Sequence, residues 1–377
     1  MFNRLKLIAI CIIMTGLSGL MGCGSPSSDI TDNSIIYERS MELEYAENYS
    51  VDYYEGGYKL LKIKDGTEIL LVPEKAEIPS GLSEDVIVLR RPVKDLYLVS
   101  SSVMDMFAKL DALDTIRLSG QKSENWYIDE AREYMERGDI LYAGKYNRPD
   151  YELIVSEGCS LVIENTMILH SPEVLENLKS FDIPSMIEYS SYETHPLGRV
   201  EWVKFFGALT DREEEAEKLF REQAKILEEV SSYEKTDLTV AFFYITSNGM
   251  VQIRRSSDYV PKMIELAGGS YLPVYDGEEE SARTTMNMQV EEFYAGAKDA
   301  DFIIYNSSVD GGVTSIEEII EKCPVLEDFK AVKNGDVWCT TNDMYQQSMS
   351  IGYMIADIHN MLHRDTKKEM RYLIHLR

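Results

Sequence analysis

Two adjacent arginines, Arg254 and Arg255, are the side chains whose chemistry stands out most in this chain of 377 residues. The formal net charge is −27, with 65 Asp and Glu against 38 Lys and Arg, so a doubly cationic pair is conspicuous. A guanidinium group binds carboxylates and other oxyanions through paired hydrogen bonds. The pair therefore indicates either recognition of an anionic ligand or neutralisation of neighbouring acidic side chains, and the sequence leaves both open.

Cys23 is the second residue with distinctive chemistry. It ends the stretch Leu20-Met21-Gly22-Cys23, which follows a basic start and an apolar run from Leu7 to Met14 that is too short to cross a bilayer. This arrangement is typical of a bacterial lipoprotein signal, in which the thiol is diacylated and the leader removed. We therefore expect lipidation at Cys23 and an extracytoplasmic protein anchored to the cell membrane by its lipid. An uncleaved anchor and an ordinary secretory leader are the alternatives.

Other reactive side chains form no catalytic or metal-binding pattern. The sequence lacks Gly-x-Ser-x-Gly, P-loop, His-Glu-x-x-His and Cys-x-x-Cys motifs. His359 and His363 are four residues apart, but no third ligand lies near them in the sequence. We therefore expect no enzyme, no metal site and no cofactor. The sequence pI of about 4.6 also disfavours a nucleic-acid partner, because the phosphate backbone repels an acidic chain.

The cysteines downstream of Cys23 are three in number: Cys159, Cys323 and Cys339. An odd count in an exported protein argues against a disulfide framework. A bridge between Cys323 and Cys339 stays open, although buried free thiols fit the count better.

Alternating strands and helices must position these residues. The chain opens with a predicted hairpin at residues 58–72, turning at Asp65-Gly66. Further strands are predicted at residues 86–89, 96–99, 115–118, 161–163, 184–188, 238–244, 302–305 and 335–339. Helices are predicted at residues 104–113, 126–137, 172–181, 259–267, 290–297, 315–321 and 351–364. This alternation predicts an α/β protein with mostly parallel sheets covered by helices.

A long helical segment interrupts the alternation. Thr210-Asp-Arg-Glu213 matches a capping box, and an apolar stripe with the period of a helix continues to Val230. Counted from Pro196, the helical stretch is nearly continuous, which predicts two β/α lobes joined by one long rigid helix. The expected organisation is a signal peptide at 1–22, a flexible tether at 23–48, an N-terminal lobe at 49–200, a connecting helix at 201–234 and a C-terminal lobe at 235–377.

Three segments in this order resemble one known family. They are Glu193–Trp202 leading into Phe205–Leu209, then Tyr259–Gly269 with its Gly-Gly exit, and Phe329–Trp338. Together they resemble the substrate-binding lipoproteins of ABC importers for iron-siderophores, haem and vitamin B12, over residues 85 to 362. The segment before Gly81 is longer than the shortest one in the family, and no sequence pattern identifies the ligand.

The resemblance implies a ligand cleft between the lobes. The implied function is capture of a metal chelate, ferric siderophore first and then corrinoid or haem, and its delivery to an ABC permease. An extracytoplasmic enzyme or a ligand sensor on the same two-lobed fold is the alternative.

Ligands of parallel sheets bind beyond the carboxyl ends of the strands. In the first lobe this rule selects the loops at 100–102, 121–126, 144–147, 165–167 and 189–193. In the second it selects 246–249 with the arginine pair, 284–286, 306–308 and 342–345. Aromatic and cationic side chains in or near these loops are the expected ligand contacts: Trp126, Tyr146, Tyr189, Tyr192, Arg254, Arg255, Tyr259 and Tyr345.

Docking to the permease is expected to use acidic side chains, as the resemblance implies. On the first lobe Glu173 matches the family position, and Glu176 lies close by. On the second lobe Lys262 falls nearer the expected place, so Glu265 and Asp258 are weaker candidates. A solvated helix face explains all of them equally well.

Overall fold

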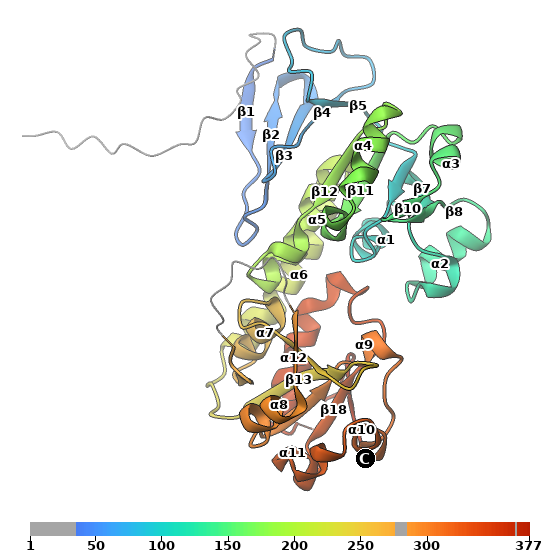
Figure 1. Ribbon diagram of the computed structural model, residues 1–377. Coiled ribbons are helices and arrows are strands. Elements are labelled where there is room, and N and C mark those ends of the chain that lie inside the picture. Colours follow the sequence, from blue (N-terminus) through green and yellow to red (C-terminus); the bar gives the residue numbers. More distant parts are fainter. Residues whose placement is uncertain (1–34, 276–284, 366–367) are drawn as a thin grey trace, which may run out of the picture.

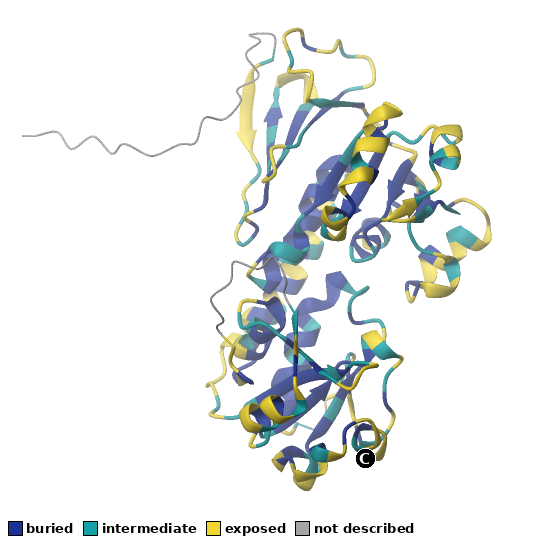
Figure 2. Ribbon diagram, viewed as in Figure 1, coloured by how far each residue is buried: buried dark blue, intermediate teal, exposed yellow. Residues whose placement is uncertain are grey.

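The computed structural model describes residues 35–275, 285–365 and 368–377, which form two β/α lobes one above the other (Figure 1). Cys23 and the rest of the expected signal lie outside the described residues. No helix in the described ranges is long and apolar enough to cross a membrane. In both lobes the central sheet strands are buried and the outer helix faces are exposed (Figure 2).

The N-terminal lobe is built on a sheet whose described strands are all parallel. In sheet order they are β12 (Ser185–Glu188), β11 (Leu161–Asn165), β6 (Leu96–Leu98), β7 (Ile116–Ser119) and β8 (Leu141–Tyr142). Its helices are α1 (Met104–Lys109), α2 (Asp129–Glu136), α3 (Tyr151–Ser156), α4 (Pro172–Ser180) and α5 (Pro196–Thr210). Because the strands are parallel, their carboxyl ends meet at one edge of the sheet.

The C-terminal lobe has a mixed sheet. In order it contains β16 (Thr285–Met288), β14 (Val251–Arg254), β13 (Thr239–Ile245), β17 (Phe302–Tyr305), β18 (Val337–Thr340) and β19 (Leu373–His375), with β15 (Ser270–Leu272) beside β13. Strands β13, β15, β17 and β18 run parallel, whereas β14, β16 and β19 are antiparallel additions. Helices α7 (Tyr259–Leu266), α8 (Val290–Ala297), α9 (Ser307–Asp310), α10 (Ile316–Lys322), α11 (Lys330–Asn334) and α12 (Ile351–Leu362) complete the lobe. The predicted α/β class with two lobes is confirmed.

A separate sheet precedes the first lobe. It consists of β1 (Tyr37–Ser40), β2 (Tyr49–Tyr54), β3 (Tyr58–Ile63), β4 (Glu68–Val72) and β5 (Ile87–Arg90). The predicted hairpin at Asp65-Gly66 is confirmed by the β3–β4 pair.

The expected tether is wrong where it overlaps the described chain, because residues 37–40 form β1 of the separate sheet and residues 44–48 are bonded to the N-terminal lobe. The buried carboxylate of Glu201 accepts the main-chain N–H groups of residues 44, 45 and 46 at 2.8–3.1 Å. Glu193 likewise accepts those of Glu47 and Asn48, at 2.9 and 3.1 Å. A polar segment therefore becomes ordered through carboxylates about 150 residues away in the sequence.

The connecting segment also differs from the expectation, because the helical stretch is broken. Asp211 has a left-handed conformation with φ of 60°, so α5 ends at Thr210 and α6 (Glu213–Ser231) begins anew. The predicted capping box is wrong, since the Thr210 hydroxyl donates to the Phe206 carbonyl inside α5 at 2.7 Å. The connector between the lobes is α6 alone, rather than a helix that begins at residue 201.

Two salt bridges to Asp211, one of them from the buried Lys59, hold this break in place. Lys59 donates to the Asp211 carboxylate at 2.7 Å, and Arg91 donates to it at 3.0 Å. Burial alone would raise the pKa of the Asp211 carboxyl, but these two hydrogen bonds lower it. Helix α6 then runs back along α5, so closely that a Cβ on Gly207 would lie 2.5 Å from that of Ala216.

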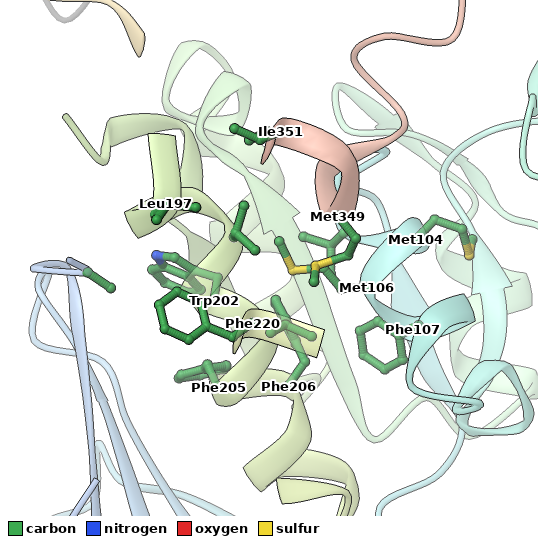
Figure 3. Packing of buried hydrophobic residues seen from close by; sticks show 14 of the residues in the cluster. Met104, Met106, Phe107, Leu197, Trp202, Phe205, Phe206, Phe220, Met349 and Ile351 are labelled. Atoms are coloured by element: carbon green, nitrogen blue, oxygen red, sulfur yellow. The ribbon is translucent and has the colours of Figure 1, made fainter. Parts of the chain in front are cut away.

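One hydrophobic cluster passes through both lobes. It contains Trp202 and Phe206 of α5, Phe220 of α6, and Phe242 and Ile355 of the C-terminal lobe. Figure 3 shows its centre, where Met349 of the C-terminal lobe projects toward the buried residues of α1. The lobes are therefore joined by shared packing as well as by the chain.

Candidate ligand-binding site

A pocket of about 390 Å³ lies at the carboxyl edge of the N-terminal sheet. Its walls come from the ends of β6, β7, β8 and β11, and its lining residues are Val99, Ser101, Gly120, Gln121, Lys122, Glu124, Asn125, Tyr142, Lys145, Tyr146 and Asn165. Most of these residues belong to the loops that the strand-end rule selected.

The pocket has an excess of positive charge. Lys122 lies 5.9 Å from the centre of the Tyr142 ring, and its amine is 3.7 Å from the Glu124 carboxylate. Lys145 is exposed and has no ion pair within the described part of the chain. Two ammonium groups against one carboxylate favour an anionic guest, and the two tyrosine rings supply flat apolar surface.

A second polar cluster lies in the C-terminal lobe, where β14 and β17 end. Arg254 is 12% exposed, and its guanidinium lies 3.5 Å from the Asp258 carboxylate. It also donates to the hydroxyl of Tyr345, which accepts from the Asn306 amide at 2.8 Å. Tyr271 holds the main chain of Arg254 by two hydrogen bonds, at 2.9 and 3.0 Å. The cluster is rigid before any ligand arrives.

The two arginines of the pair fit different interpretations. Arg254 has its own carboxylate, Asp258, as the neutralisation hypothesis expects. Arg255 is half-buried, and its Nε atom has no hydrogen-bond partner within the described residues. Asp258 is itself buried and accepts the N–H of Val260 at the start of α7, so it is unsuited to docking on the surface.

The expected tyrosine contacts are spread over three places. Tyr146 lines the pocket, and Tyr345 belongs to the Arg254 cluster. Tyr189 and Tyr192 contact each other edge to face, with ring centres 5.7 Å apart. Burial and an interaction with Asp65 of the β3–β4 turn raise the pKa of Tyr189 to about 12. Tyr189 is therefore tied to the added sheet, and the structure does not place it in the pocket.

Two expected aromatic contacts are buried. Tyr259 packs under the guanidinium of Arg199, 4.0 Å from its ring centre, where α7 meets α5. Trp126 is 2% exposed and follows the pocket residue Asn125 directly, so it lies behind the pocket wall. Neither side chain is open to a ligand in this conformation.

Sequence reasoning missed the lysines of the pocket. Lys122 lies inside the predicted 121–126 loop and Lys145 inside the 144–147 loop, but aromatic residues and arginines were preferred there. Their signal was available, because both are cations at strand ends in an acidic chain. Within the described residues no group of three or more His, Cys, Asp or Glu side chains could hold a metal ion.

The predicted docking residues lie on two helices. Glu173 and Glu176 are exposed on α4 and have no ion pair within the described part of the chain. Glu265 on α7 is already paired, with Lys262 at 2.8 Å and with Lys235 at 3.9 Å. Cys159, Cys323 and Cys339 are free thiols, as the odd count favoured.

Comparison with solved structures relates the fold to binding proteins. An ABC transporter substrate-binding protein from Listeria monocytogenes matches with a TM-score of 0.54 and 18% identity, over 71% of this chain and 98% of that one. The periplasmic heme binding protein HutB of Vibrio cholerae matches with a TM-score of 0.55 and 13% identity, over 70% and 97%. A protein of an ABC-type Fe3+-hydroxamate transport system from Saccharomonospora viridis gives 0.55 and 17%, over 72% and 93%. At these identities the likeness shows a shared fold.

Curated relatives and a family profile extend the match along the sequence. The uncharacterized lipoprotein MJ0878 of Methanocaldococcus jannaschii is 26% identical over 96% of this chain and 94% of its own length. A second lipoprotein of that organism, MJ0872, is 26% identical over 95% of each chain. The family described as periplasmic binding protein matches residues 98–344, which include the connector and most of both lobes. The chain therefore belongs to the periplasmic binding protein family, which makes it a binding protein rather than an enzyme.

Proposed function

We propose that this protein is an extracytoplasmic, lipid-anchored receptor that captures a metal chelate and passes it to an ABC permease. A ferric siderophore is the first candidate, and a corrinoid or haem comes next. The observation that carries the proposal is that each lobe has cationic side chains where its sheet strands end, with Lys122 and Lys145 in the N-terminal lobe and Arg254 and Arg255 in the C-terminal lobe. Anionic ferric chelates offer oxygen atoms that suit such groups.

The size and chemistry of the pocket support a chelate over a bare ion. A volume of about 390 Å³ suits a small organic ligand, and a group of metal-binding side chains is lacking in the described residues. A chelate brings its own metal ligands, so the protein has only to recognise charge and shape. Among the solved neighbours are a heme binding protein and a protein of an Fe3+-hydroxamate transport system, which agrees with this class.

Lipid anchoring at Cys23 is part of the proposal. The lipoprotein pattern supports it, as do the names of the two archaeal relatives. Two acyl chains hold a protein at a bilayer durably, whereas one chain binds only reversibly.

Docking is proposed to depend most on α4. Glu173 and Glu176 present carboxylates without an ion pair in the described chain, ready for a basic surface on the permease. Glu265 has to exchange its bond with Lys262 before it can contribute. We expect charge reversal at Glu173 and Glu176 to abolish stimulation of the transporter ATPase, with no change in ligand affinity. Charge reversal at Glu265 should have a smaller effect.

The test of ligand class is a fluorescence titration of the full chain in detergent. Ferric catecholate, ferric hydroxamate, haem and cobalamin are added in separate experiments. Trp126, behind the pocket wall, is the reporter, whereas Trp202 lies in the deep core and Trp338 stacks on His375. Loss of the response in Trp126→Phe, and its survival in Trp202→Phe, would assign the signal to the pocket. A chain that responds to none of the four ligands refutes the proposed class.

A further inference from the structure

The segment Tyr345–Met349 of the C-terminal lobe reaches across to the N-terminal lobe. It follows β18 and leads into α12, and we call it the strap. Gln346 makes two hydrogen bonds to main-chain atoms of the other lobe. Its Oε1 atom accepts the N–H of Tyr127 at 2.8 Å, and its Nε2 atom donates to the carbonyl of Asn125 at 2.9 Å.

The strap is anchored at its far end. Met349 is 4% exposed and belongs to the hydrophobic cluster shared by the lobes, and its side chain projects toward α1 (Figure 3). Its N–H donates to the carboxylate of Asp105 at 2.8 Å, and the hydroxyl of Ser348 donates to the Ser102 carbonyl at 2.6 Å. This anchoring fixes where the Gln346 amide can reach.

The strap also joins the two halves of the candidate site. The Asn125 carbonyl that accepts from Gln346 accepts from Gln121 as well, at 2.7 Å, and both Gln121 and Asn125 line the pocket. The preceding strap residue, Tyr345, belongs to the Arg254 cluster. A continuous chain of hydrogen bonds and adjacent residues therefore runs from Arg254 to the pocket rim.

The rim is fixed at Gln121 by hydrogen bonds to the Ser119 hydroxyl and at Trp126 by burial in the hydrophobic cluster, but the main chain between and after these points has few hydrogen bonds within its own lobe. It includes a single 3-10 turn, Ser123–Asn125, whose local bonds run from the N–H of Asn125 to the Lys122 carbonyl and from that of Trp126 to the Ser123 carbonyl. The Tyr127 N–H has the Gln346 amide as its acceptor. Short 3-10 segments have poor hydrogen-bond geometry and depend on outside contacts.

We propose that Gln346 is a positioning residue of the ligand pocket, which acts from the C-terminal lobe by fixing the Gln121–Tyr127 rim of the N-terminal lobe. The part of this inference that concerns ligand rests on the proposed function. Gln346 touches the rim rather than the ligand, so its loss leaves the pocket residues present but mobile. Ligand binding then has to order the rim, which lowers affinity.

Amide hydrogen exchange of the full, ligand-free chain tests the positioning directly, because the Tyr127 N–H is one of the bonds in question. We expect Gln346→Ala to accelerate exchange at Tyr127 at least ten-fold while β3 exchanges as in the wild type. Gln347→Ala is the matched control, since no hydrogen bond of the Gln347 side chain occurs in the described structure. Gln346→Glu keeps an acceptor for Tyr127 and loses the donor to Asn125, so it should retain protection at Tyr127.

Three outcomes of this experiment would overturn the proposal. The first is exchange at Tyr127 in Gln346→Ala at the wild-type rate. The second is exchange at Tyr127 that is accelerated as much in Gln347→Ala as in Gln346→Ala. The third is exchange at β3 that is accelerated in Gln346→Ala as much as exchange at Tyr127, which would mean general unfolding. A second arm measures binding of ferric catecholate, for which we expect about ten-fold weaker affinity in Gln346→Ala and none of that loss in Gln347→Ala. Unchanged affinity would refute the link to ligand. If the wild type does not bind ferric catecholate, that ligand is excluded and the binding arm uses whichever of the four ligands the wild type does bind, while the exchange data still decide the positioning role.

Discussion

Replacing Glu164 by glutamine should remove a large part of the pH dependence of stability. Glu164 lies on β11, is fully buried, and neither carboxyl oxygen has a hydrogen-bond partner in the described structure. Burial raises its pKa from 4.5 to about 8. The folded protein therefore keeps this group protonated at neutral pH, whereas the unfolded chain ionises it.

The sign and size of the effect follow from linkage. Because the folded pKa is the higher one, the contribution of Glu164 to stability is fully present below pH 4.5 and is lost as the pH rises toward 8. Each pKa unit corresponds to about 1.4 kcal/mol, so the loss is about 3 kcal/mol by pH 7 and about 4 kcal/mol by pH 8, where the folded group is half ionised. Glutamine has nearly the same shape and does not titrate. The stability of Glu164→Gln relative to the wild type should therefore increase with pH by these amounts.

Urea unfolding of both proteins at pH 5, 6, 7 and 8 measures this difference, because all other titrating groups cancel. Glu133→Gln, at an exposed position on α2, is the control and should follow the wild type at every pH. If the Glu164→Gln and wild-type curves stay parallel, the carboxyl is either solvated or partnered when folded, and the reasoning fails.

Three further predictions concern the framework. Glu201→Gln should lower stability by about 2 kcal/mol in thermal unfolding, because Gln binds the 44–46 amides less strongly than the carboxylate does, whereas Lys204 keeps its ion pair with Glu217 at 2.9 Å. A loss under 1 kcal/mol would contradict this prediction. Gly207→Ala should lower the free energy of unfolding by about 1–3 kcal/mol, because the added methyl group overpacks the contact between α5 and α6. An unchanged melting temperature would contradict this prediction and would show that the two helices can move apart. Cys23→Ser should move the protein from the membrane fraction to the soluble fraction, and retention in the membrane would contradict lipid anchoring.

The regular part of the fold could be predicted from the sequence. Short β-rich runs alternating with helical patterns indicated both β/α lobes, and the Asp65-Gly66 turn located a hairpin. These features are local, since each depends on residues within one element. Helix α6 was expected for the same reason, through its apolar stripe.

Tertiary contacts explain what the sequence could not show. The break at Asp211 depends on Lys59 and Arg91, more than 100 residues away in the chain. The ordering of residues 44–48 likewise depends on Glu193 and Glu201. No local sequence pattern predicts such long-range contacts.

The candidate site was predictable by place and less so by residue. The strand-end rule selected the loops that hold Lys122 and Lys145, whereas the preference for aromatic side chains selected Tyr259 and Trp126, which are buried. Burial depends on how elements pack, which periodicity alone does not determine. Gln346 gave no signal at all, because its partners belong to the other lobe.

The central claim is that one anionic chelate contacts both lobes at once. A double-mutant cycle with Lys145→Ala and Arg254→Ala, read by calorimetric titration with the ferric chelate that binds best, tests it most directly. We predict that each single variant weakens binding about ten-fold or more. This result would mean that the chelate is held between the two sites. Binding that neither substitution alters, or that only one of them alters, would contradict capture between the lobes.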